Sequence, residues 1–169
     1  MRRLGRRLGC VVASAAAMLG VAGCSVESGG VVGLTIDGSG QPVAVIAVCE
    51  GYIDGVSVWS DRQGTEVDLG SWKRSEPVID LSKLSLQTPG PEWTEERDLA
   101  ELPASERVQI YGWTTKNRWS ASGPGFTVED LARLRADAVW FEEYDDGAGE
   151  WVMTYVAEKD FRAAACRSL

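Results

Sequence analysis

Residues 31–49 read VVGLTIDGSGQPVAVIAVC, and they predict the fold more directly than any other part of the chain. Residues 31–36 form a short β-prone run, residues 37–40 (Asp-Gly-Ser-Gly) favour a tight turn, and residues 43–49 form a second, almost wholly apolar run. A strand that is apolar at consecutive positions is typical of the centre of a sheet, where both faces are buried. The stretch therefore predicts a β-hairpin with a central second strand.

The rest of the chain repeats this pattern of short strands and turns. Further strands are expected at residues 55–60, 65–72, 78–86, 107–114, 118–122, 138–144 and 151–156. Short helical segments are expected near residues 127–134, where Thr127 and Asp130 have the spacing of a capping box, and near residues 158–166. Residues 92–106, with six acids and one arginine, fit either an extended edge strand or a short exposed helix.

Short strands separated by turns, with helix only in fragments, predict an all-β domain. Such a pattern is typical of two packed antiparallel sheets, and we expect a two-sheet β-sandwich of immunoglobulin-like or fibronectin-like topology. Spacing alone leaves the strand order open.

The N-terminus predicts export and lipid attachment. Residues 1–9 carry four arginines and no acid, and the apolar run at residues 10–22 is shorter than the roughly 20 residues that a membrane-spanning helix needs. The following Val-Ala-Gly-Cys at residues 21–24 resembles the lipobox of bacterial lipoproteins, which implies that Cys24 receives a diacylglyceryl group and becomes the new N-terminus. An ordinary cleaved signal with an incidental cysteine is the alternative, and general or twin-arginine export remains open.

These features divide the chain into three parts. We expect a lipoprotein signal peptide at residues 1–23, a lipidated flexible tether at residues 24–30 and a single domain at residues 31–169. The protein is then a lipoprotein on the extracytoplasmic face of the cell membrane, and membrane lipid is its first partner, through the acylated cysteine.

The charge of the chain excludes one class of partner. The full sequence has 17 basic and 25 acidic residues, and removal of residues 1–23 takes away four arginines and no acid, which leaves a net charge of −12. A domain this acidic, without a basic cluster, is repelled by phosphate backbones. Nucleic acid is therefore excluded as a partner.

Two of the four cysteines are expected to form a disulfide. Cys10 leaves with the signal peptide and Cys24 takes the lipid, so Cys49 and Cys166 remain. In an oxidising, exported compartment such a pair is expected to join. Two buried free thiols are the alternative.

Most of the mature chain also resembles small extracytoplasmic proteins of actinobacteria. The features that carry the resemblance are Pro-Val at 42–43 leading to Cys49, Ile-Asp-Gly at 53–55, Tyr-Gly-Trp-Thr at 111–114, Tyr-Asp-Asp at 144–146 and the terminal residues 161–166. The resemblance implies the domain boundaries and the cysteine pair, and it implies no activity.

The chemistry open to the chain is narrow. It contains no histidine, which excludes hydrolases built on a histidine base, and it has neither a GxxxxGK[ST] loop nor a GxGxxG motif for nucleotides. We therefore expect no enzyme and no cofactor. A glycoside hydrolase, which needs only two facing carboxylates, is the alternative. Asp145, Asp146 and Glu150 are weak candidates for a calcium site, because their spacing lacks the alternation of an EF-hand.

The seven tryptophans carry the functional hypothesis. Alternation along the predicted strands directs several aromatic side chains away from the valine and isoleucine face. The candidate binding surface comprises Trp59, Trp72, Tyr111, Trp113, Trp140, Glu142 and Trp151. Such a surface suits a non-enzymatic binding or interaction module of the cell envelope, with an envelope protein or a cell-wall glycan as partner. The alternative is that loops or the terminal helix cover these rings as a second small core.

Overall fold

The computed structural model describes residues 26–167 and residue 169, and in this part of the chain it is mainly β, which confirms the all-β prediction. The predicted signal peptide and Cys24 lie outside the described residues. The elements are β1 (Glu27–Ile36), β2 (Pro42–Val48), β3 (Ile53–Arg62), β4 (Thr65–Val78), β5 (Leu81–Ser85), β6 (Trp93–Arg97), β7 (Val108–Trp113), β8 (Trp119–Ser122), β9 (Gly125–Phe126), α1 (Val128–Leu131), β10 (Ala138–Asp145), β11 (Glu150–Ala157) and α2 (Glu158–Ala165).

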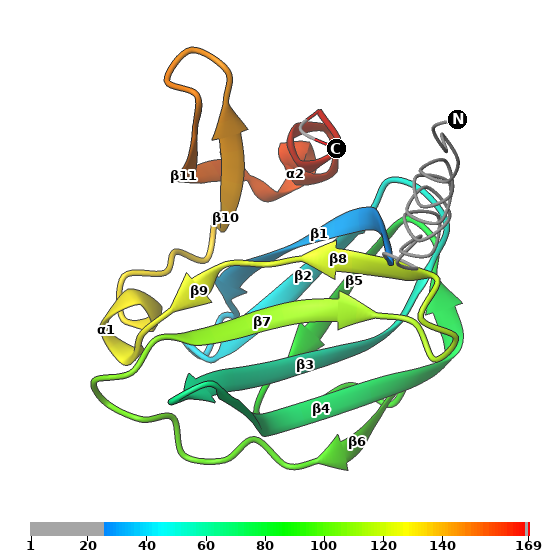
Figure 1. Ribbon diagram of the computed structural model, residues 1–169, viewed down its shortest axis with the longest axis vertical. Helices are drawn as coiled ribbons and strands as arrows, with labels where there is room; N and C mark the ends of the chain where they lie inside the picture. The colour runs from blue at the N-terminus through cyan, green and yellow to red at the C-terminus, as the bar shows by residue number, and fades with distance from the viewer. Residues whose placement is uncertain (1–25, 168) are drawn as a thin grey trace, which may run out of the picture.

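All eleven strands belong to one sheet that curls into a nearly closed barrel, so the predicted two-sheet sandwich is wrong (Figure 1). The barrel wall runs β6-β4-β3-β7-β8-β1-β2-β5. The physical reason is β1, which pairs with β2 on one edge and, on the other, with β8 in parallel and with β10. This strand joins strands that a sandwich would keep in separate sheets.

Side chains bridge the barrel where β5 faces β4 and β6. The indole Nε1 of Trp93 donates a hydrogen bond to the Lys83 carbonyl oxygen at 3.0 Å. The Arg74 guanidinium donates to the Ser82 hydroxyl at 2.8 Å and lies 5.4 Å from the centroid of the Trp93 ring. These contacts hold together two strand edges that share no ladder of backbone hydrogen bonds.

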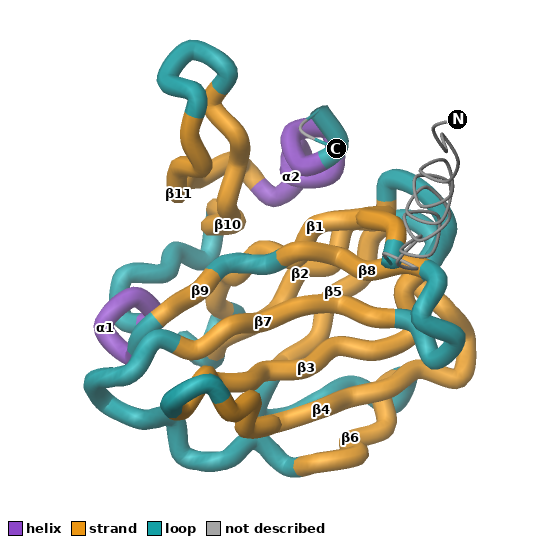
Figure 2. Tube along the Cα trace, viewed as in Figure 1, coloured by secondary structure: helices purple, strands orange, loops and turns teal. Residues whose placement is uncertain are grey.

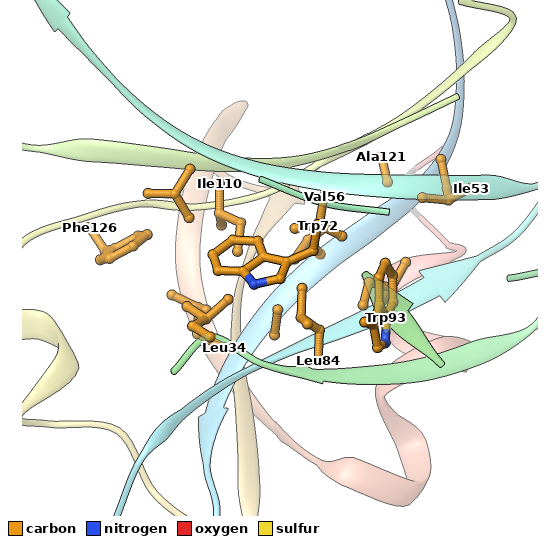
Figure 3. Close-up of a cluster of buried hydrophobic side chains, with 14 of the residues drawn as sticks. Leu34, Ile53, Val56, Trp72, Leu84, Trp93, Ile110, Ala121 and Phe126 are labelled. Carbon is orange, nitrogen blue, oxygen red and sulfur yellow. The ribbon is translucent and has the colours of Figure 1, made fainter. Parts of the chain in front are cut away.

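Apolar side chains fill the inside of the barrel (Figure 3). Trp72 is 0% exposed there, among Leu34, Leu84, Ile110 and Phe126. Each fully buried side chain of this size contributes about 1.5 to 3 kcal/mol relative to an exposed one. The barrel interior is therefore a packed core.

The inward position of Trp72 contradicts the prediction that it points outward. A register shift separates the pairs Val58↔Gly70 and Trp59↔Asp68, so β4 has one extra residue at this point. An extra residue moves all later side chains to the opposite face of a strand. Trp72 consequently lies opposite inward-facing Val56.

A second layer covers the outer side of β1 and β2. Phe141 from β10 and Phe161 from α2 meet edge to face at 5.1 Å, and both are fully buried in a small core. The predicted disulfide between Cys49 and Cys166 is present and ties the end of α2 to the end of β2. Arg162 in α2 also donates a hydrogen bond to the Val48 carbonyl oxygen at 3.1 Å.

Several local predictions are confirmed, one open alternative is settled and one boundary is corrected. Thr127 and Asp130 form the expected capping box at α1, and the last hairpin and α2 lie where they were expected. Residues 92–106 contain the edge strand β6 and no helix. The first strand begins at Glu27 and not at residue 31, because residues 27–31 pair with β8, so residues 27–30 are strand and not flexible tether. Among the described helices, none has the length and hydropathy required to span a membrane.

Candidate binding surface

Three of the predicted aromatic residues gather on the outer face of the barrel wall. Strands β3 and β7 pair so that Trp59 lies opposite Gln109, Ser57 opposite Tyr111, and Gly55 opposite Trp113. The alternate residues of both strands, such as Val56, Val58 and Ile110, are buried in the core. Alternation therefore directs Trp59, Tyr111 and Trp113 outward, and we call these three residues the aromatic face.

The Trp113 ring is held in a fixed position. Its indole Nε1 donates a hydrogen bond to the Ser57 hydroxyl at 2.9 Å. The ring lies directly over Gly55, where any Cβ atom would collide with the indole. Glycine at this position therefore lets the ring lie flat against the wall, and the hydrogen bond fixes its direction.

Tyr111 lies directly opposite Ser57 in the β3–β7 ladder and is 38% exposed. Burial raises the pKa of its hydroxyl above the ordinary 10.0, the hydrogen bond with Ser57 lowers that pKa, and the carboxylates of Glu66 and Asp68 raise it. Tyr111 is accordingly protonated at neutral pH and keeps a hydroxyl donor at the surface.

An open groove of about 400 Å³ runs beside the aromatic face. It is lined by Trp59, Glu66, Gln109, Ile110, Tyr111, Ser122 and Gly123. Two of these side chains are aromatic rings, and three others supply carboxylate, amide and hydroxyl groups. The groove thus offers apolar ring surface together with directional polar contacts.

The carboxylates near the groove have different surroundings. Asp68 forms an ion pair with Arg97 at 3.1 Å, and its carboxylate also accepts a hydrogen bond from the Gly70 backbone N–H at 3.1 Å. Glu66 is exposed and lines the groove itself. Glu66 is therefore the acid best placed to contact a ligand.

The other predicted surface residues lie elsewhere. Trp72 is inside the barrel, as described above. Trp140 is 8% exposed and packs against the main core beside Leu34, so the prediction that it points outward is wrong. Both faces of β10 are covered at this level, because Trp140 meets the main core while its neighbour Phe141 meets α2. The half-buried Glu142 and the exposed Trp151 lie farther along the β10–β11 hairpin.

The proposed calcium ligands do not form a metal site. Across residues 26–167 and 169, no group of three or more Asp, Glu, Cys or His side chains is arranged to hold a metal ion. The Asp145 carboxylate instead accepts hydrogen bonds from the backbone N–H groups of Gly147 at 2.8 Å and Ala148 at 3.2 Å. This acid closes the hairpin turn.

Sequence reasoning missed the polar residues of the groove. Gln109 in the groove, and Ser57 that binds the Trp113 indole beside it, follow from the same alternation that directs Trp59 and Tyr111 outward, so a signal for them existed. Glu66 and Ser122 come from neighbouring strands, and only the register of the folded sheet brings them to the groove.

Comparison of the chain with family models, with curated proteins and with solved structures returns no match. The class that the fold and the site define is a filled, nearly closed β-barrel with an aromatic face and a groove on its outer wall.

Proposed function

We propose that this protein is a non-enzymatic binding module of the cell envelope, held on the extracytoplasmic face of the membrane by a lipid on Cys24. Its binding surface is the aromatic face with the adjacent groove. The observation that carries the proposal is that Trp59, Tyr111 and Trp113 lie together on two neighbouring strands and face outward.

Because side chains fill the barrel interior, we place the binding site on the outer surface of the barrel. Small barrels that carry a ligand inside need a cavity, whereas the inner side chains of this barrel fill the space between its walls. Tryptophan and tyrosine are also enriched among the residues that dominate protein interfaces. Because Trp113 is already fixed by Ser57 and Gly55, little side-chain freedom is lost when a partner covers it. We therefore place an envelope protein first among the partners.

A glycan is the second candidate, and the composition of the groove favours it. The rings of Trp59 and Tyr111 offer flat apolar surfaces, while Gln109 and Glu66 offer hydrogen-bonding groups within the same groove. Flat rings stack on the apolar faces of sugar rings, and the polar groups bind sugar hydroxyls. Hydrolysis of a glycan would need two facing carboxylates about 5 to 9.5 Å apart, whereas Glu66 is the one carboxylate among the lining residues.

Retention on envelope material tests the binding surface. The purified protein is mixed with envelope membranes and, separately, with purified cell-wall polymers, over a range of salt concentrations. We expect the wild type to be retained on one of the two and a Trp59→Ala, Tyr111→Ala double variant to be released. A Glu95→Gln, Glu96→Gln double variant on strand β6, which contributes no residue to the aromatic face or to the groove lining, is the surface control. Equal retention of all three proteins, or retention of none, contradicts the proposal.

Metabolic labelling with a fatty-acid probe tests the anchor. The wild type is expected to incorporate the probe, and the Cys24→Ala variant is expected to remain unlabelled. Equal labelling of both proteins removes the lipid from the proposal without affecting the binding surface.

A further inference from the structure

The β10–β11 hairpin, residues 138–157, extends away from the barrel, and we call it the arm (Figures 1 and 2). Its two strands pair with each other over eight positions, from Ala138↔Ala157 to Asp145↔Glu150. The arm pairs with the barrel wall at a single position, Leu34↔Trp140. Beyond that point it is a two-stranded ribbon whose base packs against α2 through Phe141. A ribbon of this kind is at best marginally stable in water without such packing.

The outer edge of β11 is an open strand edge. In the described part of the chain, β10 is the only strand that pairs with β11. Natural proteins protect such an edge with lysine, proline, a bulge or a covering segment. The eight residues of β11, EWVMTYVA, contain neither lysine nor proline, and their register with β10 is unbroken. The strand therefore presents a regular row of backbone groups to which a further strand can pair.

One face of the arm carries aromatic rings up to its tip. Tyr144 and Trp151 lie opposite each other, with ring centroids 5.4 Å apart, and they are 40% and 55% exposed. Tyr155 lies on the same face nearer the barrel, also 40% exposed, and the Arg135 guanidinium lies 5.7 Å from its ring centroid. This contact within the chain is an example of how the rings of the arm accept a cation.

The charge of the arm restricts what can bind it. Residues 138–157 contain five acids and neither lysine nor arginine. The acids are Glu142, Glu143, Asp145, Asp146 and Glu150. A second copy of the arm would bring like charges together, which opposes pairing of two arms. Charge complementarity therefore favours a positively charged partner.

We propose that the arm binds an extended, positively charged peptide segment of a partner protein, which adds to the open edge of β11 as a further strand. Backbone hydrogen bonds supply the ladder, and alternate lysine or arginine side chains contact the rings of Trp151 and Tyr155 and the nearby acids. This surface is separate from the aromatic face, so it adds a second binding site to the proposed module.

Calorimetric binding of two synthetic peptides to the full-length protein tests the proposal. The first probe alternates lysine and valine over ten residues, and the second has the same sequence with alternate backbone nitrogens methylated. Methylation keeps the charge and removes the donors that a strand ladder requires. We expect the second peptide to bind at least about tenfold more weakly, because several backbone hydrogen bonds are lost. Equal affinities would show attraction by charge alone, and absence of binding by the first peptide also overturns the proposal.

Matched variants locate the site. Trp151→Ala is expected to weaken binding of the first peptide by about tenfold or more, as for a central interface tryptophan. Glu142→Gln with Glu150→Gln is expected to weaken it at low salt, whereas Glu95→Gln with Glu96→Gln on β6 removes the same charge at the other end of the sheet and leaves affinity unchanged. Equal losses from both pairs overturn the proposal. Trp59→Ala is expected to have no effect, which separates this test from that of the aromatic face.

Discussion

The barrel and the arm hold their tryptophans in opposite ways. Trp72 in β4 is 0% exposed and surrounded by a core to which every strand of the wall contributes. Trp151 in β11 is 55% exposed and meets Tyr144 at the tip of a two-stranded ribbon. The difference follows from pairing, because the central barrel strands have neighbours on both edges, whereas the arm has one pairing position on the wall. The barrel is thus the scaffold, and the arm depends on its attachments.

The largest effect is expected from the disulfide that attaches α2. Reduction, or the Cys49→Ser, Cys166→Ser double variant, opens a cross-link between residues 117 apart in sequence, which in the chain-entropy model costs about 4 to 5 kcal/mol of unfolding free energy. Denaturant unfolding with and without reductant measures the loss. Reductant should have no effect on the double variant. Unchanged wild-type stability after full reduction contradicts this expectation.

The two contrasting tryptophans give the next prediction. Trp72→Ala leaves a large cavity in the barrel core and should cost about 3 to 5 kcal/mol in unfolding free energy. Trp151→Ala removes an exposed ring and should change stability by less than about 0.5 kcal/mol. Denaturant unfolding of both variants measures the contrast. Similar losses of unfolding free energy in the two variants would contradict the contrast between the buried Trp72 and the exposed Trp151.

Gly55 tests how closely the Trp113 ring lies against the wall. A Cβ atom at residue 55 collides with the indole, so Gly55→Ala should destabilise the protein by about 1 to 3 kcal/mol and alter the fluorescence of Trp113. At Gly38 a Cβ atom meets nothing within 4 Å, and Gly38→Ala is the control, with a change of less than about 0.5 kcal/mol. Equal effects of the two substitutions would show that the ring is mobile.

Two serines of β3 test the hydrogen bond that fixes Trp113. Ser57→Ala removes the acceptor of the indole N–H and should cost about 1 kcal/mol. The buried Ser60 hydroxyl has no hydrogen-bond partner among the described residues, so Ser60→Ala should be neutral or slightly stabilising. Thermal unfolding of the two variants measures the difference. The reverse order of stability contradicts the assigned contacts.

The smallest effect concerns pH and Tyr111. Because burial raises the pKa of Tyr111 above 10.0, the unfolded chain loses this proton at a lower pH than the folded chain. Stability therefore falls as the pH rises through the interval above about pH 10, and it is unaffected below that interval. Urea unfolding of the wild type and of Tyr111→Phe at several alkaline pH values measures this part of the pH dependence. The variant should show a shallower decline, and identical slopes would contradict the shift.

The sequence predicts elements better than it predicts their assembly. The first and last hairpins, the capping box at Thr127 and the pairing of Cys49 with Cys166 follow from local patterns, and the structure confirms them. The sandwich prediction failed because β1 accepts three neighbouring strands, one of them parallel, and no local pattern encodes that choice.

The residues of the candidate site, like the strands of the fold, were predicted only in part from the sequence. Alternation correctly directed Trp59, Tyr111 and Trp113 outward, because β3 and β7 are regular where they pair. The same rule failed for Trp72, because an extra residue in β4 reverses the faces, and for Trp140, because both faces of β10 are covered. The sequence pattern of a strand predicts which face of the strand a side chain occupies. Only the assembled sheet shows whether that face is covered by other elements or exposed to solvent.

Photo-crosslinking in living cells tests the central claim most directly, namely that the aromatic face is the binding surface of this protein. A photoreactive amino acid replaces Tyr111 in one strain and Glu96, which is exposed on strand β6 outside the groove lining, in another. We predict a discrete adduct with an envelope component from position 111 and none from position 96. Equal adducts from both positions, or none from position 111, would contradict the account.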